Sequence, residues 1–421
     1  MFFLAQQFFQ YKHNILNIEN VNVLDIAKNI GTPVYCYSLN AIKSNYKQFQ
    51  DNLPPNSIIC YAVKSNSNLS ILSLLSSLGA GADVVSEGEI RRAIAAGISP
   101  TKIVFSGVGK TEQEINFALD NRILQLNVES IEELSLINKI ACQKNIIALV
   151  SIRINPNISA DTNDKITTGL KINKFGIPEE LLDQVLNNNF IGIRITGISV
   201  HIGSQISNLH IFQKTIDKIK KIVKNFEQHN IQIARVDLGG GLGIPYNNSD
   251  TFPTIKEYAS LLKNNFEKEN YQIICEPGRA LIGNTGILLA KVLYHKNNQE
   301  KKHLILDTGM NDLIRPALYN AEHTIIPVVI SSTPIESFDI VGPICESDDT
   351  FAYNYHINDL QNGEIVAICT TGAYGSSMSS NYNSRLLVPE VIVNKNSYNI
   401  IRHRQTYEDM LKNEVILKFN K

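Results

Sequence analysis

The strongest constraint on the fold is a regular alternation of short apolar segments with amphipathic helical segments between residues 58 and 279. The apolar segments have the length and composition of buried strands, and the segments between them have helical periodicity. The expected strands are 58–64, 82–86, 102–107, 123–128, 147–154, 194–202, 233–238 and 272–276. Eight strands that alternate with helices predict a (β/α)8 barrel of the TIM type, and a doubly wound open sheet is the structural alternative.

The pattern changes after residue 279. Few helical patterns separate the strand-like segments 282–292, 303–307, 324–330, 338–341, 364–370 and 387–393. A mostly β second domain is the expected result. Residues 34–37 are also strand-like and precede the barrel, so we expect them to pair into that domain. The predicted division is a barrel over 36–280 and a β-rich domain formed by 1–35 with 281–421.

Composition excludes several classes of function. The chain has 421 residues, 43% hydrophobic and 19% charged, with a formal net charge of −1. A near-neutral balance gives no reason to expect a nucleic-acid or membrane-surface partner. The six cysteines form no C-x-x-C pair, which favours reduced thiols in the cytoplasm. We expect no membrane span, no signal peptide and no metal site.

A single lysine, Lys64, ends the first expected strand. Apolar and β-branched residues lead up to it, which places its amine at the carboxyl end of a buried strand, where α/β barrels carry their chemistry. Partial desolvation would lower the pKa of this amine and prepare it to form a Schiff base with an aldehyde. The alternative is a structural lysine that extends from the strand end into water.

Other polar residues also lie in the expected strands or at their carboxyl ends. Asp83 lies in the second expected strand, Arg153 near the end of the fifth, His201 at the end of the sixth and Glu276 at the end of the eighth. A lone histidine at a strand end is commonly structural. Because the carboxyl ends of all barrel strands meet at one face, we nevertheless expect these side chains to share one site.

The seventh strand is followed by Gly239, Gly240 and Gly241. Glycines expose backbone N–H groups that can cradle a phosphate, although such a run can also be a simple tight turn. The spacing is not that of a nucleotide P-loop. A phosphorylated aldehyde cofactor that needs a lysine is pyridoxal 5'-phosphate. Glu276 could then hydrogen-bond the pyridine nitrogen, and His201 could stack on the ring.

Four segments carry a resemblance to a known family: 61–66, 201–205, 239–241 and 276–279. Together they resemble the pyridoxal-phosphate decarboxylases of the alanine-racemase fold, which include the ornithine, arginine and diaminopimelate decarboxylases. The resemblance extends from Thr32 to Arg404. It implies a cofactor-binding barrel, a β domain, and an obligate homodimer with active sites shared at the interface.

The segment 307–319 resembles the signature of the diaminopimelate decarboxylases. That resemblance implies decarboxylation of meso-2,6-diaminopimelate to L-lysine and CO2, the last step of lysine biosynthesis. It makes Lys64 and Cys345 the catalytic residues, with Cys345 donating a proton across the dimer interface. A thiol is suited to that task because its pKa is close to neutrality.

The same resemblance implies two sets of binding residues. Those expected to bind the cofactor are Lys64, Asp83, His201, Ser204, Gly240, Gly241, Glu276, Gly278, Arg279 and Tyr374. Those expected to bind substrate are Arg279, Arg315, Tyr319, Glu346 and Tyr374. Guanidinium groups grip carboxylates bidentately, and Glu346 could bind the distal ammonium of the substrate. Surface ion pairing is the alternative for Arg315 and Glu346.

Three other functions compete with this reading. A decarboxylase of ornithine, arginine or carboxynorspermidine would share the chemistry, but Arg315, Tyr319 and Glu346 favour a substrate with a second amino-acid head. A catalytically dead relative would have lost the lysine or the donor cysteine, and both are present. An alanine racemase normally places arginine opposite the pyridine nitrogen, which conflicts with Glu276.

Overall fold

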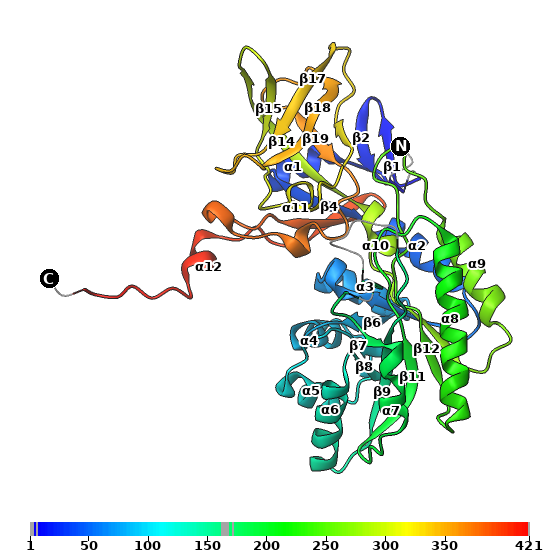
Figure 1. The fold of residues 1–421 in the computed structure, drawn as a ribbon. Coiled ribbons are helices and arrows are strands. Elements are labelled where there is room, and N and C mark those ends of the chain that lie inside the picture. Colours follow the sequence, from blue (N-terminus) through cyan, green and yellow to red (C-terminus); the bar gives the residue numbers. More distant parts are fainter. Residues whose placement is uncertain (1–3, 6, 161–167, 171, 420–421) are drawn as a thin grey trace. The chain divides into compact units, whose positions relative to one another are not determined.

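The computed structural model describes residues 4–5, 7–160, 168–170 and 172–419. The chain divides into two compact units. The barrel unit comprises residues 42–245 and 249–283, and the β-rich unit comprises residues 1–41, 246–248 and 284–421. The expected borders lie a few residues from these, since all of β4 (Val34–Ser38) and residues 39–41 belong to the β-rich unit. Figure 1 shows the elements of both units.

The barrel unit is a closed ring of eight parallel strands. They are β5 (Ile58–Ala62), β6 (Gly81–Val84), β7 (Ile103–Phe105), β8 (Gln125–Val128), β9 (Ala148–Asn155), β11 (Ile193–Ser199), β12 (Arg235–Asp237) and β13 (Gln272–Cys275). Each strand pairs with the next, and β13 pairs with β5 to close the ring. The barrel prediction is therefore confirmed and the open sheet is excluded. The short β10 (Ile177–Pro178) pairs in parallel with the last two residues of β9.

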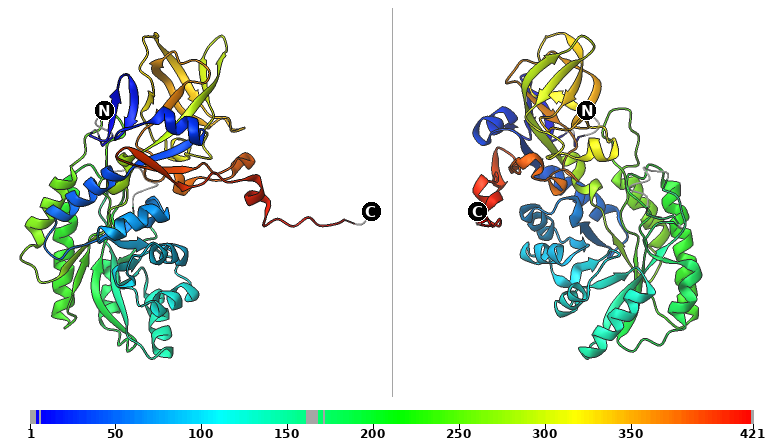
Figure 2. Two further views of the ribbon diagram at one scale, coloured as in Figure 1. Left: turned by 180° about the vertical axis from the view of Figure 1, so that it is seen from behind. Right: turned by 60° about the vertical axis from the view of Figure 1, so that its left-hand side comes forward.

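Helices cover the outside of the barrel strands (Figures 1 and 2). They include α2 (Leu39–Asn52), α3 (Leu69–Ser77), α4 (Glu87–Ala95), α5 (Glu112–Asp120), α6 (Ile131–Gln143), α7 (Leu182–Leu186), α8 (Leu209–Gln228), α9 (Ile255–Phe266) and α10 (Arg279–Ile282). Apolar residues on one face of α8, from Ile211 to Phe226, are buried in the manner of an amphipathic helix. No helix among the described residues is long and apolar enough to cross a membrane.

Four barrel helices begin with the same type of N-cap, in which a hydroxyl side chain accepts a backbone N–H group. The hydroxyl groups of Ser86, Thr111, Ser130 and Thr254 each accept the backbone N–H of a glutamate three residues later. Such a cap satisfies one of the free N–H groups of the first turn and contributes about 1 kcal/mol to helix stability. The caps of α4, α5 and α6 fix the loops that follow β6, β7 and β8, on the face where the candidate site lies.

The β-rich unit contains two sheets. A small antiparallel sheet is formed by β1 (Phe9–Lys12), β2 (Ile15–Ile18) and β3 (Val21–Asn22). The larger sheet contains β4, β14 (Gly286–Asn297), β15 (Lys302–Leu306), β16 (Ile325–Pro327), β17 (Ile335–Val341), β18 (Thr350–Asn358), β19 (Ile365–Ile368), β20 (Glu390–Asn394) and β21 (Ser397–Arg402). The helices of this unit are α1 (Val23–Ile30), α11 (Arg315–Tyr319) and α12 (Tyr407–Leu411).

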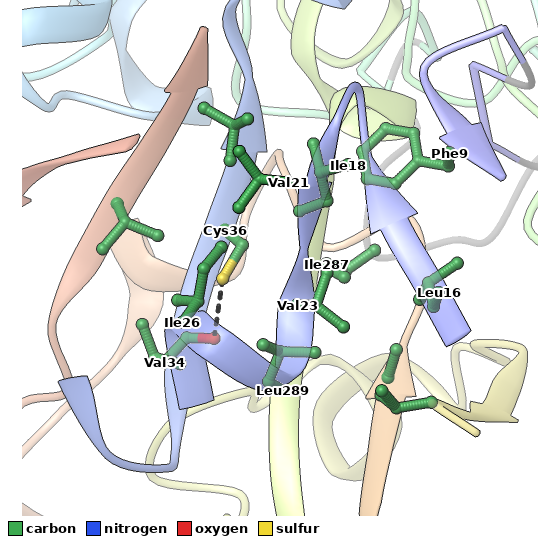
Figure 3. Packing of buried hydrophobic residues seen from close by; sticks show 14 of the residues in the cluster. Phe9, Leu16, Ile18, Val21, Val23, Ile26, Val34, Cys36, Ile287 and Leu289 are labelled. Carbon is green, nitrogen blue, oxygen red and sulfur yellow. Dashed lines mark hydrogen bonds between the residues drawn. The ribbon is translucent and has the colours of Figure 1, made fainter. Parts of the chain in front are cut away.

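Strand β4 lies in the middle of the larger sheet. It pairs with β14 on one side and with β20 on the other, so the predicted pairing of residues 34–37 into the β domain is confirmed. Its core side chains pack against residues of the small sheet, of α1 and of β14, including Phe9, Val23 and Leu289 (Figure 3). Burial of these side chains removes apolar surface from water and provides the main stabilisation of the unit.

Candidate active site

The barrel unit has a cavity of about 190 Å³ at the carboxyl ends of its strands. Lys64, His201 and Glu276 line it, together with Arg153. Arg153 lies in β9, and the other three residues follow the ends of β5, β11 and β13, which are far apart in the sequence. The structure therefore brings together, at one face of the barrel, the residues that the strand-end argument selected.

Lys64 lies just after the strand that it was expected to end. Strand β5 ends at Ala62, and Lys64 belongs to the 3₁₀ turn η1 (Val63–Ser65) that follows. Its Nζ lies 2.7 Å from Oδ2 of Asp83, which is fully buried in β6, while the Lys64 side chain is 37% exposed. Asp83, which the resemblance places among the cofactor-binding residues, thus holds the amine of Lys64 at the cavity.

Glu89 is a titratable neighbour that sequence reasoning missed. It lies in α4, where its position after the Ser86 cap indicates only a capping residue. Its carboxylate accepts the N–H of Val85 at 2.8 Å. Burial raises the pKa of Glu89 to about 7, and the charge of Asp83 adds to the increase, whereas Lys64 opposes it. The Lys64 amine therefore has two carboxyl groups in its surroundings.

His201 is a neutral imidazole. Burial holds its pKa well below the usual value, and the positive charges of Lys64 and Arg153 act in the same direction. Its Nδ1 lies 3.1 Å from the backbone nitrogen of Gly240, which can only donate. The remaining ring proton therefore lies on Nε2. This contact fixes the ring against the glycine loop that the sequence singled out.

The glycine loop has no room for side chains. A Cβ atom at Gly240 would lie 2.3 Å from the carbonyl oxygen of Glu276. At Gly241, φ is +105° and a Cβ atom would lie 2.6 Å from the carbonyl oxygen of Gly203. Only glycine therefore allows this close approach of backbone to backbone.

Two further predicted residues meet in the barrel unit. A guanidinium nitrogen of Arg279, Nη2, donates to the hydroxyl of Ser204 at 3.2 Å. Gly278 precedes Arg279 and packs against η1, because a Cβ atom at Gly278 would approach Ala62 and Ser65 to 3.1 Å. The Lys64 turn and the segment after β13 are thus closely packed.

Glu276 directly follows β13 and is 7% exposed. It shares a hydrogen bond with Asp237, the last residue of β12. Burial raises the pKa of both carboxyl groups, and the charges of Asp237 and Asp83 add to the increase at Glu276, whereas Lys64 opposes it. Each of two carboxyl groups in such contact disfavours the ionisation of the other. The sequence indicated Glu276 but not Asp237.

Arg153 is held by Glu129. Its Nη1 lies 2.6 Å from Oε1 of Glu129, and its guanidinium lies 4.9 Å from the ring centre of Phe175. Glu129 also accepts the backbone N–H groups of Gly107 and Gly176 at 2.9 Å. Glu129, another residue that sequence reasoning missed, therefore fixes both an arginine of the cavity and two loops near it.

The remaining predicted residues lie in the β-rich unit. Arg315 begins α11, is 5% exposed, and stacks over the ring of Tyr246 at 4.9 Å. Tyr319 ends the same helix and is half-buried, as is Tyr374 in the loop after β19. The carboxylate of Glu346 accepts the Tyr382 hydroxyl at 2.7 Å.

Asp349 joins the two segments that the sequence singled out in this unit. Its carboxylate accepts the N–H of Met310 and the N–H of Ile344, both at 2.6 Å. The segment before Arg315 and the loop that carries Cys345 are therefore tied together by one buried side chain. The sequence carries no signal for Asp349, because its two partners are backbone N–H groups and no residue pattern marks an acid that binds them.

The barrel cavity fits pyridoxal phosphate by the chemistry of its lining. An amine, a carboxyl group and a neutral imidazole face one small space, and a glycine loop that excludes side chains packs against His201 and Glu276. These are the groups that such a cofactor needs for its aldehyde, ring nitrogen, ring face and phosphate. Among the described residues, no cluster of His, Cys, Asp and Glu side chains has the arrangement of a metal site.

Comparison with known proteins agrees with this chemistry. Residues 39–283 match the family model described as the pyridoxal binding domain of pyridoxal-dependent decarboxylases. The diaminopimelate decarboxylase of Aquifex aeolicus is 42% identical over 403 residues, covering 95% of this chain and 96% of that one. The diaminopimelate decarboxylase of Haemophilus influenzae is also 42% identical, covering 96% of this chain and 98% of that one.

Solved structures give the same result. The crystal structure of the Helicobacter pylori diaminopimelate decarboxylase complexed with L-lysine has a TM-score of 0.89 at 43% identity, covering 93% of this chain and 98% of that one. The M. jannaschii diaminopimelate decarboxylase in co-complex with L-lysine has a TM-score of 0.92 at 36% identity, covering 98% and 99%. The chain therefore belongs to the diaminopimelate decarboxylases, the pyridoxal 5'-phosphate-dependent carboxy-lyases that convert meso-2,6-diaminopimelate into L-lysine and CO2.

Proposed function

We propose that this chain performs its family's reaction, the release of CO2 from meso-2,6-diaminopimelate, at the barrel cavity. The observation that carries the proposal is the meeting of Lys64, His201 and Glu276 around one small cavity at the carboxyl ends of the strands. The family model covers the same part of the chain and describes a pyridoxal binding domain. The product would be L-lysine, so the reaction would be the last step of lysine biosynthesis.

In this proposal the barrel residues hold the cofactor. Lys64 provides the amine for its aldehyde, with Asp83 positioning that amine. Glu276 binds the ring nitrogen, and His201 covers the ring face. The backbone of Gly240, Gly241 and Gly278, with Ser204 and Arg279, surrounds the phosphate, and Tyr374 completes the set. When bound, the cofactor supplies an electron sink for the carbon that loses CO2.

The substrate would be recognised by charge. Arg315 carries a planar guanidinium group, which binds a carboxylate through two parallel hydrogen bonds. We propose that Arg315, with Arg279 and Tyr319, binds the carboxylate groups of the substrate, and that Tyr374 contacts it as well. Glu346 would bind the distal ammonium, a role supported by its exposed carboxylate. These contacts would hold one amino-acid head while the other reacts.

Cys345 would hold the proton that replaces the lost carboxyl group. Of the six cysteines, all of which lie in the described residues, only Cys345 is exposed. Burial raises the pKa of Cys36, Cys60, Cys275 and Cys369 far above neutrality. Exposure on a loop is suited to a group that acts on a second subunit. We therefore propose a cytoplasmic homodimer in which each active site uses residues of both chains.

The direct test is a substrate panel on purified protein with pyridoxal phosphate. CO2 and L-lysine are measured together for meso-diaminopimelate, and CO2 alone for ornithine and arginine. We expect turnover of meso-diaminopimelate only, since the other two lack the second carboxylate that Arg315 would bind. Turnover of ornithine or arginine in its place would contradict the assignment of Arg315 and Glu346. Absence of CO2 from every substrate would contradict the proposed function itself.

A further inference from the structure

A chain of polar side chains runs from the half-buried Arg235 through the barrel interior to Glu276, and its other members are buried. Arg235 donates from Nε to Oε1 of Gln125 at 2.8 Å, and Gln125 donates from Nε2 to Oδ1 of Asn127 at 2.9 Å. Asn127 then donates from Nδ2 to Oδ2 of Asp237 at 3.0 Å. The chain ends at the hydrogen bond between Asp237 and Glu276.

Each amide in this chain has a fixed orientation. An arginine can only donate, so the oxygen of Gln125 must face Arg235 and its NH2 group must face Asn127. The oxygen of Asn127 is therefore occupied, and its NH2 group must face the carboxyl groups. It lies 3.0 Å from Asp237 and 3.5 Å from Oε1 of Glu276. The direction of every bond follows from Arg235, at the start of β12.

Asp237 itself has no freedom to turn away. It is 1% exposed, and its second oxygen, Oδ1, accepts the N–H of Gly239 at 3.0 Å. Gly239 begins the glycine loop that carries the His201 contact through Gly240. Asp237 thus lies between two parts of the candidate cofactor site, the carboxyl group of Glu276 and the glycine loop, and touches both.

The charges around the pair are few. Asp83 adds negative charge near both carboxyl groups, and Lys64 opposes it at Glu276. Tyr258, Cys60 and Cys275 also face the pair, but burial raises the pKa of all three, so they are neutral at physiological pH. Asp237 is therefore the source of negative charge in direct contact with Glu276.

We propose that Asp237 is a positioning residue that keeps a proton in the contact between Glu276 and the ring nitrogen of the cofactor. A fixed negative charge beside Glu276 favours the protonated form of whatever group Glu276 binds. A protonated ring nitrogen makes the cofactor a better electron sink. The inference rests on the proposed function, because it takes the barrel cavity as the cofactor site.

The test replaces the charge and keeps the shape, with Asp237→Asn. The holoenzyme is loaded with pyridoxal phosphate labelled with ¹⁵N at the ring nitrogen. In the wild type we expect the nitrogen resonance of a protonated ring at neutral pH. In Asp237→Asn we expect the resonance to move toward that of the unprotonated ring. The value of kcat should fall about tenfold, and KM should change less than about threefold.

The matched control is Asp120→Asn, which makes the same chemical change in an exposed salt bridge with Lys144. It should leave the resonance and kcat unchanged. A purely structural role for Asp237 would lower cofactor content or stability without moving the resonance of the cofactor that remains bound. That result would overturn the inference, as would an Asp237→Asn resonance equal to that of the wild type.

A measurement on the wild type alone keeps the inference testable if Asp237→Asn does not fold. The ring nitrogen should stay protonated as the pH rises above neutrality, and an unprotonated ring at neutral pH would contradict the inference. The proposed function and the role of Asp237 are refuted by different results. A wild type that does not decarboxylate refutes the proposed function, whereas an active wild type with an unprotonated ring refutes only the role of Asp237.

Discussion

The barrel cavity and the Cys345 loop of the β-rich unit place their candidate residues in opposite environments. Asp83, Asp237 and Glu276 are buried, and each is held by a partner from another element of the barrel unit. Cys345 and Glu346 are exposed on a loop. The difference teaches that the candidate residues of the barrel are fixed by partners within one chain, whereas the Cys345 loop presents its candidate residues at the surface.

Buried acids have different tasks in the two units. In the barrel, the carboxylate of Asp83 binds the amine of Lys64, a side chain that lines the cavity. In the β-rich unit, Asp349 binds two backbone N–H groups, so its charge serves the shape of a loop. Burial of either carboxylate is costly unless it is paired or hydrogen-bonded. A buried aspartate therefore holds a candidate catalytic side chain in the barrel unit, and holds the backbone of two segments in the β-rich unit.

The largest effect is expected in the barrel. Lys64→Ala removes the amine that the proposal assigns to the cofactor, so CO2 release from meso-diaminopimelate should fall by about a thousandfold or more. The measurement is steady-state release of CO2 at saturating cofactor. Lys102→Ala, which removes an exposed lysine bonded to a backbone carbonyl, is the control and should retain full activity. An active Lys64→Ala would refute the cofactor assignment.

A smaller loss is expected from the exposed loop. Cys345→Ala removes the proposed proton donor, so kcat should fall by about a hundredfold while cofactor binding to the barrel is unchanged. Kinetics and cofactor absorbance are measured on the same sample. Cys142→Ala, in α6, is the matched control and should behave as the wild type. Loss of bound cofactor in Cys345→Ala would break the separation between the two regions.

Arg315→Lys tests the substrate contact with the charge retained. Lysine lacks the planar fork that binds a carboxylate through two hydrogen bonds, so KM for meso-diaminopimelate should rise by about thirtyfold. Arg194→Lys, on the exposed side of β11, is the control. An unchanged KM would show that Arg315 is a structural arginine that stacks on Tyr246.

The smallest effect concerns the stability of the apoprotein. The pKa of Glu89 is raised from 4.5 to about 7, so the folded state holds a proton that the unfolded state releases. Stability from this group is complete below pH 4.5 and is lost as the pH rises through 7. Between pH 5 and pH 7.5, the free energy of unfolding of the wild type should fall by on the order of 1–2 kcal/mol more than that of Glu89→Gln. Urea unfolding of both proteins at the two pH values measures the difference. Equal declines for both proteins would contradict the assignment.

Much of the fold could be predicted because its signals are local. Eight apolar segments with helices between them indicate a barrel whatever the details of their ends. The strand β18 was missed although it is rich in aromatic residues. Asn354 lies inside it with a positive φ of 48°, and the register with β17 shifts nearby. A bulge of this kind interrupts the alternation on which strand prediction depends.

The site could be predicted only in part. Lys64, His201 and Glu276 were found because each follows an apolar strand. Asp237 and Asn127 were missed, since they lie within short strands and their importance depends on partners from other strands. A signal was present in β8, where Gln125 and Asn127 alternate with Leu126 and Val128. All four residues are buried, so the alternation marked a polar side chain facing the barrel interior.

Mixing the two inactive variants tests most directly whether the barrel half and the loop half of the site come from different chains. Lys64→Ala and Cys345→Ala proteins are purified, dissociated, mixed in equal amounts and assayed for CO2. If each site combines Lys64 of one subunit with Cys345 of the other, a mixed dimer has one intact site, and random pairing restores about one quarter of wild-type activity. A mixture as inactive as either variant would contradict the shared site.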